Sequence, residues 1–591
     1  MKKILVVILC LMLIMTCILT GCSKKENGLV DKAGENINSQ NNKSNETQSV
    51  QDVQQSQGTE VQEEQELKAA ENTQDTLENN STSIFDMDGG MAVTQDTDMS
   101  INGSIEYGWE EPLPPTSEEY AKIDEAGFLN TTQNPLSTFS IDVDTASYAN
   151  LRKNINYGLL PEKDAVRIEE MLNYFSYEYK EPTGDIPFSI NTEIGRCPWN
   201  EESYLLKVGI QGKNVDMESL PKSNLVFLID VSGSMDEADK LPLLQNAFSQ
   251  LVQNLGENDR VSIVVYAGNS GVVLNSVSGN EKRIILDAIG SLSAGGSTGG
   301  AEGIERAYQL AEKNYIQGGN NRVILATDGD FNVGPSSPEE LEVLIEEKRE
   351  SGIYLSVIGF GSGNLKDNRM ETLADKGNGN YSYIDSPKEA KKVLVDEMSG
   401  TLLTIAKDVK IQLEFNPYYV DSYRLIGYEN RALKDEDFEN DAVDAGELGA
   451  GHSVTAIYEI VPSRVAISEQ EQKELKYQSQ EVVIKDEYKD EITEIRLRYK
   501  KPDGDTSKEI KQVVYLSNVL LDRINLSKDF YFSAAVAEFG MLLRGSEYMG
   551  NTTTETILEL AEQGLGEDQG GYRSEFIDIV KYYKDLFSYQ W

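Results

Sequence analysis

Short apolar runs alternate with amphipathic stretches in the middle of the chain. The runs are five to eight residues long and rich in β-branched residues, which is typical of buried strands. The stretches between them carry apolar residues at intervals of three and four, which is typical of helices that cover a sheet. Strands are expected at residues 225–230, 260–266, 322–327, 353–360 and 380–384, with an antiparallel edge at 272–277. Helices are expected at residues 241–255, 281–292, 301–315, 338–351 and 387–405. This alternation predicts an α/β domain with a mostly parallel sheet and helices on both faces.

The period changes to two after residue 406. Val409, Ile411, Leu413 and Phe415 alternate with polar residues, and similar stretches continue to about residue 516. This pattern favours an antiparallel, sandwich-like region. A helical tail is expected to follow at residues 530–543, 553–563 and 572–587.

The chain ahead of the α/β domain also contains folded sequence. Strands are expected at residues 137–143 and 205–210, and helices at 148–157 and 165–175. Strands therefore stand on both sides of the α/β domain, which suggests that this domain is inserted into one composite domain built from the two flanks.

Residues 23–112 are polar and low in complexity, with too few apolar residues to bury a core, so they are interpreted as a disordered tether. At 591 residues the chain is long enough for several domains. The expected division is a signal peptide at 1–21, a tether at 22–117, an N-terminal flanking region at 118–219, the α/β domain at 220–405, a β-rich region at 406–520 and a helical region at 521–591.

The extreme N-terminus resembles a bacterial lipoprotein signal. Lys2 and Lys3 precede an almost wholly apolar run at residues 4–19, and Leu-Thr-Gly-Cys follows, ending at Cys22. The resemblance implies cleavage before Cys22, lipidation of that residue and an extracytoplasmic protein anchored to the cell membrane. The alternative is an uncleaved anchor, although the apolar run is shorter than the roughly 20 residues that a spanning helix needs.

Composition narrows the possible partners. The net charge is −45, which repels phosphate backbones and anionic head groups, so nucleic acid is excluded and membrane contact is assigned to the anchor. Once the signal is removed and Cys22 acylated, Cys197 is the one remaining cysteine, and no internal disulfide can form. Cys197 is interpreted as a small buried hydrophobe, because the sole histidine, His452, stands far along the chain.

Oxygen donors gather where the predicted strands end. The first apolar run ends in Asp230, and the hydroxyls of Ser232 and Ser234 follow at alternate positions. A glycine-rich loop at residues 293–300 contains Thr298, and the strand at 322–327 is followed by Asp328. Ligands of open α/β sheets bind beyond the carboxyl ends of the strands, and oxygen donors of this kind suit Mg²⁺, Mn²⁺ or Ca²⁺. Helix capping explains any one of these pieces, but not all three together.

This constellation resembles the metal-ion-dependent adhesion site of von Willebrand factor type A (vWA) domains, which have a Rossmann-like fold. The resemblance covers roughly residues 220–405. It implies that Ser232, Ser234 and Thr298 give hydroxyl ligands to a divalent ion, with Asp230 and Asp328 bound directly or through water. Neutral hydroxyls leave the ion's charge poorly cancelled, so an Asp or Glu of a protein partner would complete the shell.

The flanks resemble bacterial vWA lipoproteins of the YfbK type. The similar segments lie at residues 139–148, 165–175, 198–199, 444–459 and 534–545. In some vWA domains ligation shifts the last helix. Here that helix, residues 387–405, leads directly into the strand at 409–415, so metal occupancy would reach the sandwich.

Three functions are compatible with these features. The first is a membrane-anchored binding protein that engages a partner carboxylate through the ion. The second is an envelope-assembly scaffold in which the metal is structural. The third, a metal-dependent hydrolase, is the least favoured, since the chain lacks a zinc His-Glu-x-x-His motif and a P-loop. Asp142 and Asp144 flank a valine, but an EF-hand glycine is missing, so Asp144 or Thr145 is expected to cap a helix instead.

Overall fold

The computed structural model describes residues 117–216, 219–267, 269–296, 301–329, 338–463, 486–522 and 525–587. The chain divides into two units, residues 1–108 and residues 109–591, and the described residues belong to the second. The expected signal peptide, almost all of the tether and Cys22 lie outside the described residues. Among the helices that are described, none is long and apolar enough to cross a membrane.

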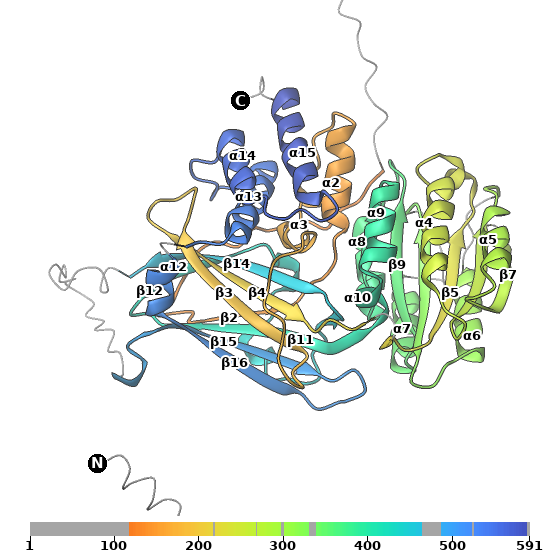
Figure 1. Cartoon of the computed structure of the whole chain (residues 1–591), viewed down its shortest axis with the longest axis horizontal. Helices are drawn as coiled ribbons and strands as arrows, with labels where there is room; N and C mark the ends of the chain where they lie inside the picture. Colours follow the sequence, from red (N-terminus) through yellow and green to blue (C-terminus); the bar gives the residue numbers. More distant parts are fainter. Residues whose placement is uncertain are drawn as a thin grey trace, which may run out of the picture. The chain divides into compact units, whose positions relative to one another are not determined.

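The α/β domain is built on a six-stranded sheet (Figure 1) with the order β10-β9-β8-β5-β6-β7. All neighbouring strands are parallel except β6 and β7, which are antiparallel. The strands are β5 (Ser223–Asp230), β6 (Arg260–Ala267), β7 (Asn269–Ser278), β8 (Asn320–Thr327), β9 (Tyr354–Phe360) and β10 (Tyr381–Ile384). The predicted parallel sheet with an antiparallel edge is confirmed.

Strand β5 lies at the centre of this sheet, and all of its residues are buried. Leu225, Phe227 and Ile229 join one apolar core, whereas Val226 and Leu228 join the core on the opposite face. The first core is closed by α4 (Leu241–Asn254), α5 (Lys282–Gly290), α9 (Pro387–Lys391) and α10 (Met398–Leu402). The second is closed by α6 (Ala301–Lys313), α7 (Pro338–Glu350) and α8 (Asp367–Lys376). A strand buried on both faces has to be apolar throughout, which explains its continuous hydrophobic run.

The other strands form two antiparallel sheets. One has the order β1-β12-β14-β4-β3, and the other has the order β13-β11-β15-β16, with β2 paired to β11. The strands that precede the α/β domain are β1 (Leu129–Asn130), β2 (Leu136–Ser140), β3 (Phe188–Arg196) and β4 (Tyr204–Gly212). Those that follow it are β11 (Thr404–Phe415), β12 (Val420–Ile426), β13 (Gly446–Gly449), β14 (Ser453–Pro462), β15 (Glu491–Lys500) and β16 (Lys508–Tyr515). Each sheet contains strands from both flanks, so the α/β domain is inserted within a composite domain, as the alternation pattern predicts.

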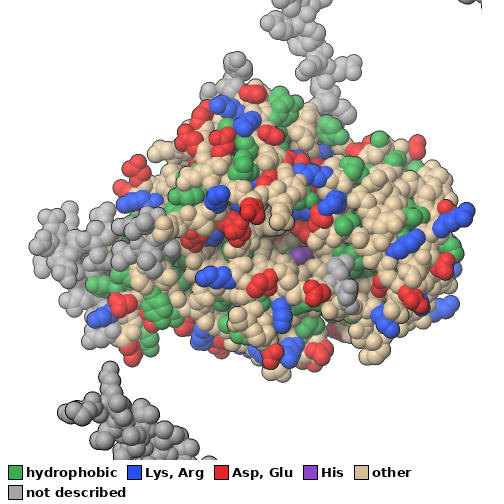
Figure 2. Space-filling model, in the orientation of Figure 1, with side chains coloured by type: hydrophobic (Ala, Val, Ile, Leu, Met, Phe, Trp, Pro, Cys, Tyr) green, Lys and Arg blue, Asp and Glu red, His purple; other side chains and the backbone are tan. Residues whose placement is uncertain are grey.

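Helices from both flanks share a third core. They are α2 (Ala146–Asn156), α3 (Ile168–Asn173), α13 (Lys528–Arg544), α14 (Thr554–Gln563) and α15 (Tyr572–Phe587), while α12 (Leu516–Asp522) contacts β3. Helix α2 also contacts β10, and its Ala146 and Ala149 belong to a core of the α/β sheet. One helix of the composite domain therefore packs into the inserted domain. On the face drawn in Figure 2, acidic and basic side chains are interspersed rather than separated.

Two of the expected helices are wrong in detail, and one further helix is present. The helix expected at 165–175 is a 3-10 turn, Lys163–Ala165, followed by the short α3, because Val166 and Arg167 adopt non-helical backbone angles. The helix expected at 387–405 breaks into α9, a π-helical turn at Lys392–Asp396 and α10, and β11 already begins at Thr404. Helix α8 was not expected at all. Its apolar face is short, and Asp367 and Glu371 are buried beside arginines of the composite domain.

The expected capping of α2 is also wrong. Thr145 occupies the N-cap position, but its side chain makes no capping hydrogen bond, and the N–H of Ser147 in the first turn donates instead to Glu170 Oε2 at 2.7 Å. The Asp144 carboxylate instead accepts the backbone N–H of Tyr381 at 2.8 Å, at the start of β10. Asp144 therefore joins the composite domain to the edge of the inserted sheet.

Candidate metal site at the carboxyl edge of the parallel sheet

Strands β5 and β8 bring the two predicted carboxylates to one edge of the sheet. The strands are parallel neighbours with Ile229 opposite Ala326, so the residues that follow emerge side by side. Asp230 and Asp328 are both fully buried. Pairing of the two strands therefore brings together carboxylates that are about one hundred residues apart in the sequence.

The turn after β5 presents the two serines. Asp230 Oδ1 accepts the backbone N–H of Ser232 at 2.8 Å, and the hydroxyls of Ser232 and Ser234 lie 2.9 Å apart. Ser232 is buried, whereas Ser234 is exposed. The three oxygen donors therefore form a continuous group that runs from the sheet edge to the surface.

The glycine-rich loop is bonded to this turn. Gly295 donates its N–H to Val231 O at 2.8 Å, and Gly233 donates its N–H to Gly296 O at 3.2 Å. Thr298 lies outside the described residues, so its predicted ligand role stays a prediction. Its neighbour Gly296 nevertheless lies against the turn that carries the serines.

The electrostatic environment of the pair is unusual. Both oxygens of Asp328 lack a hydrogen-bond donor within the part of the chain that the structure describes. The pKa of Asp230 is raised to about 6, chiefly by burial and in part by the negative charge of Asp328, against the opposing effect of the Ser232 hydrogen bonds. Two neighbouring buried carboxylates are stabilised by a positive charge beside them.

Two residues at this edge carry no clear sequence signal. The hydroxyl of Thr327 donates to Asp230 Oδ2 at 3.2 Å, which holds the second oxygen of that carboxylate. Lys240 Nζ lies 3.3 Å from Asp328 Oδ2. Lys240 ends the polar run Asp-Glu-Ala-Asp-Lys, which looks solvent-exposed in sequence, but its side chain is only 4% exposed. Asp236 in the same run is exposed.

The described donors fit a hard divalent cation. Asp230, Ser232, Ser234 and Asp328 offer oxygens only, and neither Asp328 oxygen accepts a hydrogen bond within the described chain. Oxygen ligands of this type suit Mg²⁺, Mn²⁺ or Ca²⁺ rather than zinc. Within the described ranges, no group of three or more His, Cys, Asp or Glu side chains is arranged to hold a metal.

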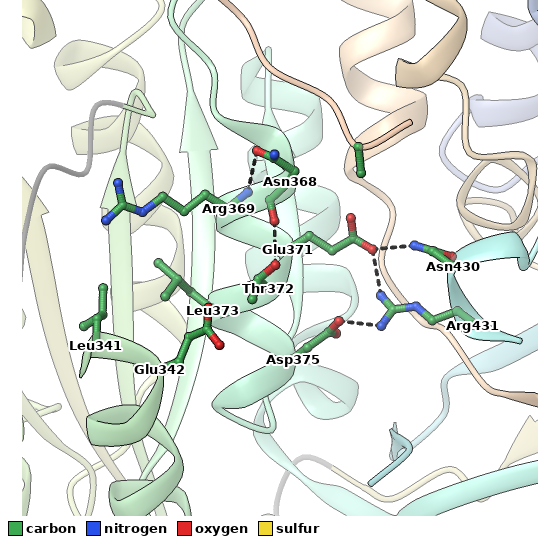
Figure 3. Close-up of a pocket in the computed structure, with 11 residues that line it drawn as sticks. Leu341, Glu342, Asn368, Arg369, Glu371, Thr372, Leu373, Asp375, Asn430 and Arg431 are labelled. Carbon is green, nitrogen blue, oxygen red and sulfur yellow. Dashed lines mark hydrogen bonds and ion pairs between the residues drawn. The ribbon is translucent and has the colours of Figure 1, made fainter. Parts of the chain in front are cut away.

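The pair Asp142 and Asp144 has a structural role instead. Both carboxylates lie within 3.5 Å of the Arg431 guanidinium, which also pairs with Glu371 and Asp375 of α8. Arg431 lines a cavity of about 460 Å³ between α7, α8 and the turn at Asn430 (Figure 3). The cation of this cluster is therefore an arginine.

Cys197 and His452 lie apart from the candidate site. Cys197 is buried, and burial raises the pKa of its thiol to about 12, as the prediction of an inert small hydrophobe requires. Burial lowers the pKa of His452, whose ring packs against Gly400. Neither has the environment of a catalytic nucleophile or base.

Family models match three parts of the chain. The von Willebrand factor type A domain matches residues 224–396, a model described as von Willebrand factor matches residues 114–207, and the C-terminal model of the uncharacterized protein YfbK matches residues 400–586. The chain is 47% identical over 475 residues to the uncharacterized protein YfbK of Escherichia coli, covering 79% of this chain and 81% of that protein.

More distant similarities concern part of the chain. Inter-alpha-trypsin inhibitor heavy chain H3 of Homo sapiens is 25% identical over 259 residues, which is 41% of this chain and 28% of that protein. A solved structure, the von Willebrand factor type A protein from Catenulispora acidiphila, is 14% identical with a TM-score of 0.38 and covers 69% of this chain and 91% of that chain. On the extent and identity of the match to the Escherichia coli protein, this chain belongs to the YfbK family of vWA-domain proteins.

Proposed function

We propose that this protein is an extracytoplasmic binding protein that grips an acidic protein partner through a divalent cation. Asp230, Ser232, Ser234 and Asp328, together with Thr298, would hold the ion, and an Asp or Glu of the partner would complete its shell. vWA-domain proteins are typically protein-interaction modules. The observation that carries the proposal is the buried Asp328 carboxylate beside Asp230, which accepts no hydrogen bond in the described chain and lies next to hydroxyls that reach the surface.

Each described residue has a defined part in this proposal. Both oxygens of the Asp230 carboxylate accept hydrogen bonds, one from the Ser232 N–H and one from the Thr327 hydroxyl. The carboxylate is therefore held in one orientation and can position the turn that carries the serines. Ser234 is exposed and marks the side on which a partner would approach. The ion itself would supply a Lewis-acidic position for the incoming carboxylate.

An enzymatic role receives little support. Residues 295–299 match the Gly-x-Ser-x-Gly spacing of serine hydrolases, but in those enzymes the serine needs an imidazole partner. The single histidine packs against Gly400 with its Nδ1 buried and without a hydrogen-bond partner in the described chain. We therefore propose a non-enzymatic function.

The ion-binding part is tested with Asp230→Asn in the full chain. We expect the parent to bind Mg²⁺ in isothermal titration calorimetry, and Asp230→Asn to bind at least about 100-fold more weakly, since even indirect supports of metal ligands are worth 10–100-fold. Asp236→Asn is the matched control, because Asp236 is an exposed carboxylate in the same turn. Parent-like Mg²⁺ binding by Asp230→Asn would overturn the proposal.

The partner-binding part is tested by crosslinked capture from the native envelope, with Mg²⁺ or with EDTA. Loss of capture both in EDTA and with Asp230→Asn supports recognition through the ion. If EDTA instead lowers the melting temperature while the captured proteins stay bound, the metal is structural and the protein acts as an envelope scaffold.

Lipid anchoring at Cys22 is a separate part of the proposal. The residue follows an apolar run and a Leu-Thr-Gly sequence. We expect Cys22→Ser to abolish incorporation of radiolabelled palmitate and to release the protein from the membrane fraction, with Cys197→Ser as the control. Unchanged labelling and sedimentation of Cys22→Ser would show that the anchor lies elsewhere.

A further inference from the structure

Lys240 is a buried cation at the candidate metal site that the vWA resemblance does not account for. It immediately precedes α4 and is only 3% exposed. Its Nζ lies 3.3 Å from Asp328 Oδ2 and 3.7 Å from Glu237 Oε2, and the Glu237 side chain is 64% exposed. Asp328 is therefore its buried partner.

The fold makes room for this side chain. A Cβ atom on Gly361 would lie 2.3 to 2.8 Å from three carbons of the Lys240 side chain. Gly361 also has a φ of +74°, which side chains rarely adopt. The aliphatic part of Lys240 thus passes through a space that a glycine keeps open, and its ammonium reaches the sheet edge.

The charge balance gives the lysine a reason to be there. A buried carboxylate without a partner is costly, and Asp328 has no hydrogen-bond donor in the described chain. An ammonium at 3.3 Å supplies the missing positive charge. A divalent ion at the same carboxylate would supply it too, and would be repelled by the lysine.

We propose that Lys240 is a tethered counter-ion that neutralises Asp328 when no divalent ion is bound and competes with that ion when it enters. The lysine then has two effects of opposite sign, since it stabilises the ion-free protein and weakens ion binding. This inference rests on the proposed ion-binding function. In addition, Lys240 would lower the affinity of the site for the divalent ion.

The decisive variant is Lys240→Met, which keeps an unbranched side chain of nearly the same length and removes the charge. We expect Mg²⁺ to bind Lys240→Met at least about tenfold more tightly than the parent, because repulsion between a divalent ion and an ammonium beside the same carboxylate is strong in a partly buried site. In EDTA the variant should melt below the parent, and saturating Mg²⁺ should raise its melting temperature by more than it raises that of the parent. Both quantities are measured on the full chain, by calorimetry and by thermal unfolding in an MgCl₂ series.

Two further variants separate charge from packing. Lys240→Arg keeps the positive charge, so its Mg²⁺ affinity should stay within about threefold of the parent. Lys207→Met removes another buried lysine, which pairs with Glu193 at 3.1 Å in the composite domain. It should lower the melting temperature without changing Mg²⁺ affinity. If Lys240→Met does not fold in EDTA, it is purified in Mg²⁺, and its affinity is obtained by competition with a chelator of known affinity.

The outcomes distinguish this inference from the proposed function. Mg²⁺ affinity of Lys240→Met equal to or weaker than that of the parent, while Asp230→Asn still loses binding, overturns the role of Lys240 alone. Absence of Mg²⁺ binding in both the parent and Lys240→Met overturns both proposals. Binding by Lys240→Met at concentrations at which the parent binds none supports the inference in its strongest form.

Discussion

Replacing Arg152 by methionine should destabilise the protein by about 3–5 kcal/mol, the usual cost of removing one partner from a buried ion network. Arg152 lies on α2 and is 2% exposed. Its guanidinium donates to Asp385, which lies just before α9, at 2.8 Å and to Glu389, which lies in α9, at 2.7 Å. It also donates to Glu575 of α15 at 3.0 Å. Removing it takes the arginine partner from the fully buried Glu389 and from the largely buried Asp385, whereas Glu575 keeps Lys388 at 3.5 Å.

This prediction concerns the join between the inserted and composite domains. Asp385 and Glu389 follow β10, whereas Arg152 and Glu575 belong to the flanks. The change in unfolding free energy is measured by urea denaturation followed by circular dichroism. Arg283→Met is the control, because Arg283 forms an exposed pair with Asp287 at 3.6 Å, and such pairs are worth at most about 1 kcal/mol. A loss for Arg152→Met as small as that of the control would mean that the network does not hold the domains together.

A second large effect is expected from Gly449→Ala. A Cβ at this position would lie 1.9 Å from the carbonyl oxygen of Gly400 and 2.6 Å from its carbonyl carbon. Both are backbone atoms that cannot rotate away. We expect a loss of about 3 kcal/mol, at the upper end of the usual cost of overpacking.

The position of Gly449 makes this result informative. It lies on β13 of the composite domain, while Gly400 lies in α10, and a Cβ on Gly400 would in turn lie 2.1 Å from the His452 ring. The backbone of the inserted domain at Gly400 therefore packs directly against the backbone of the sandwich at Gly449, shortly before β11 begins. Gly504→Ala is the control, since its nearest contact would be an ordinary 3.5 Å. Equal urea midpoints for the two variants would show that the contact at Gly400 is loose.

The same junction bears on the expected coupling between the ion and the sandwich. A single helix leading from the site into the sandwich was expected, but the segment is interrupted by a π-helical turn at Lys392–Asp396. Lys392 Nζ lies 4.3 Å from the centre of the Tyr174 ring, so side chains of the composite domain contact this turn. Hydrogen exchange of residues 387–415, with and without Mg²⁺, measures whether the segment responds to the ion.

Local sequence patterns were sufficient to predict the elements whose conformation does not depend on particular residues elsewhere in the chain. Strand β5 is apolar at every position of the run 225–229 because it is buried on both faces, and helix α15 has the predicted limits because its apolar spacing is regular. Alternation with period two identified the sandwich strands, and their position on both sides of the α/β domain indicated the insertion. The sequence pattern does not predict helix α8, because burial of its acidic residues depends on Arg167 and Arg431, which are distant in sequence.

The sequence by itself determined the α/β class, the insertion of that domain and the grouping of the oxygens of Asp230, Ser232 and Ser234, because strand burial and a turn of spaced oxygen donors are local properties. It also pointed to Asp328 through the end of a second strand. The tertiary structure alone decided that Asp144 binds Tyr381 instead of capping α2, and that Lys240 turns inward to Asp328. Those contacts pair charged and polar groups across long stretches of chain, and their energy depends on burial, which the order of residues does not reveal.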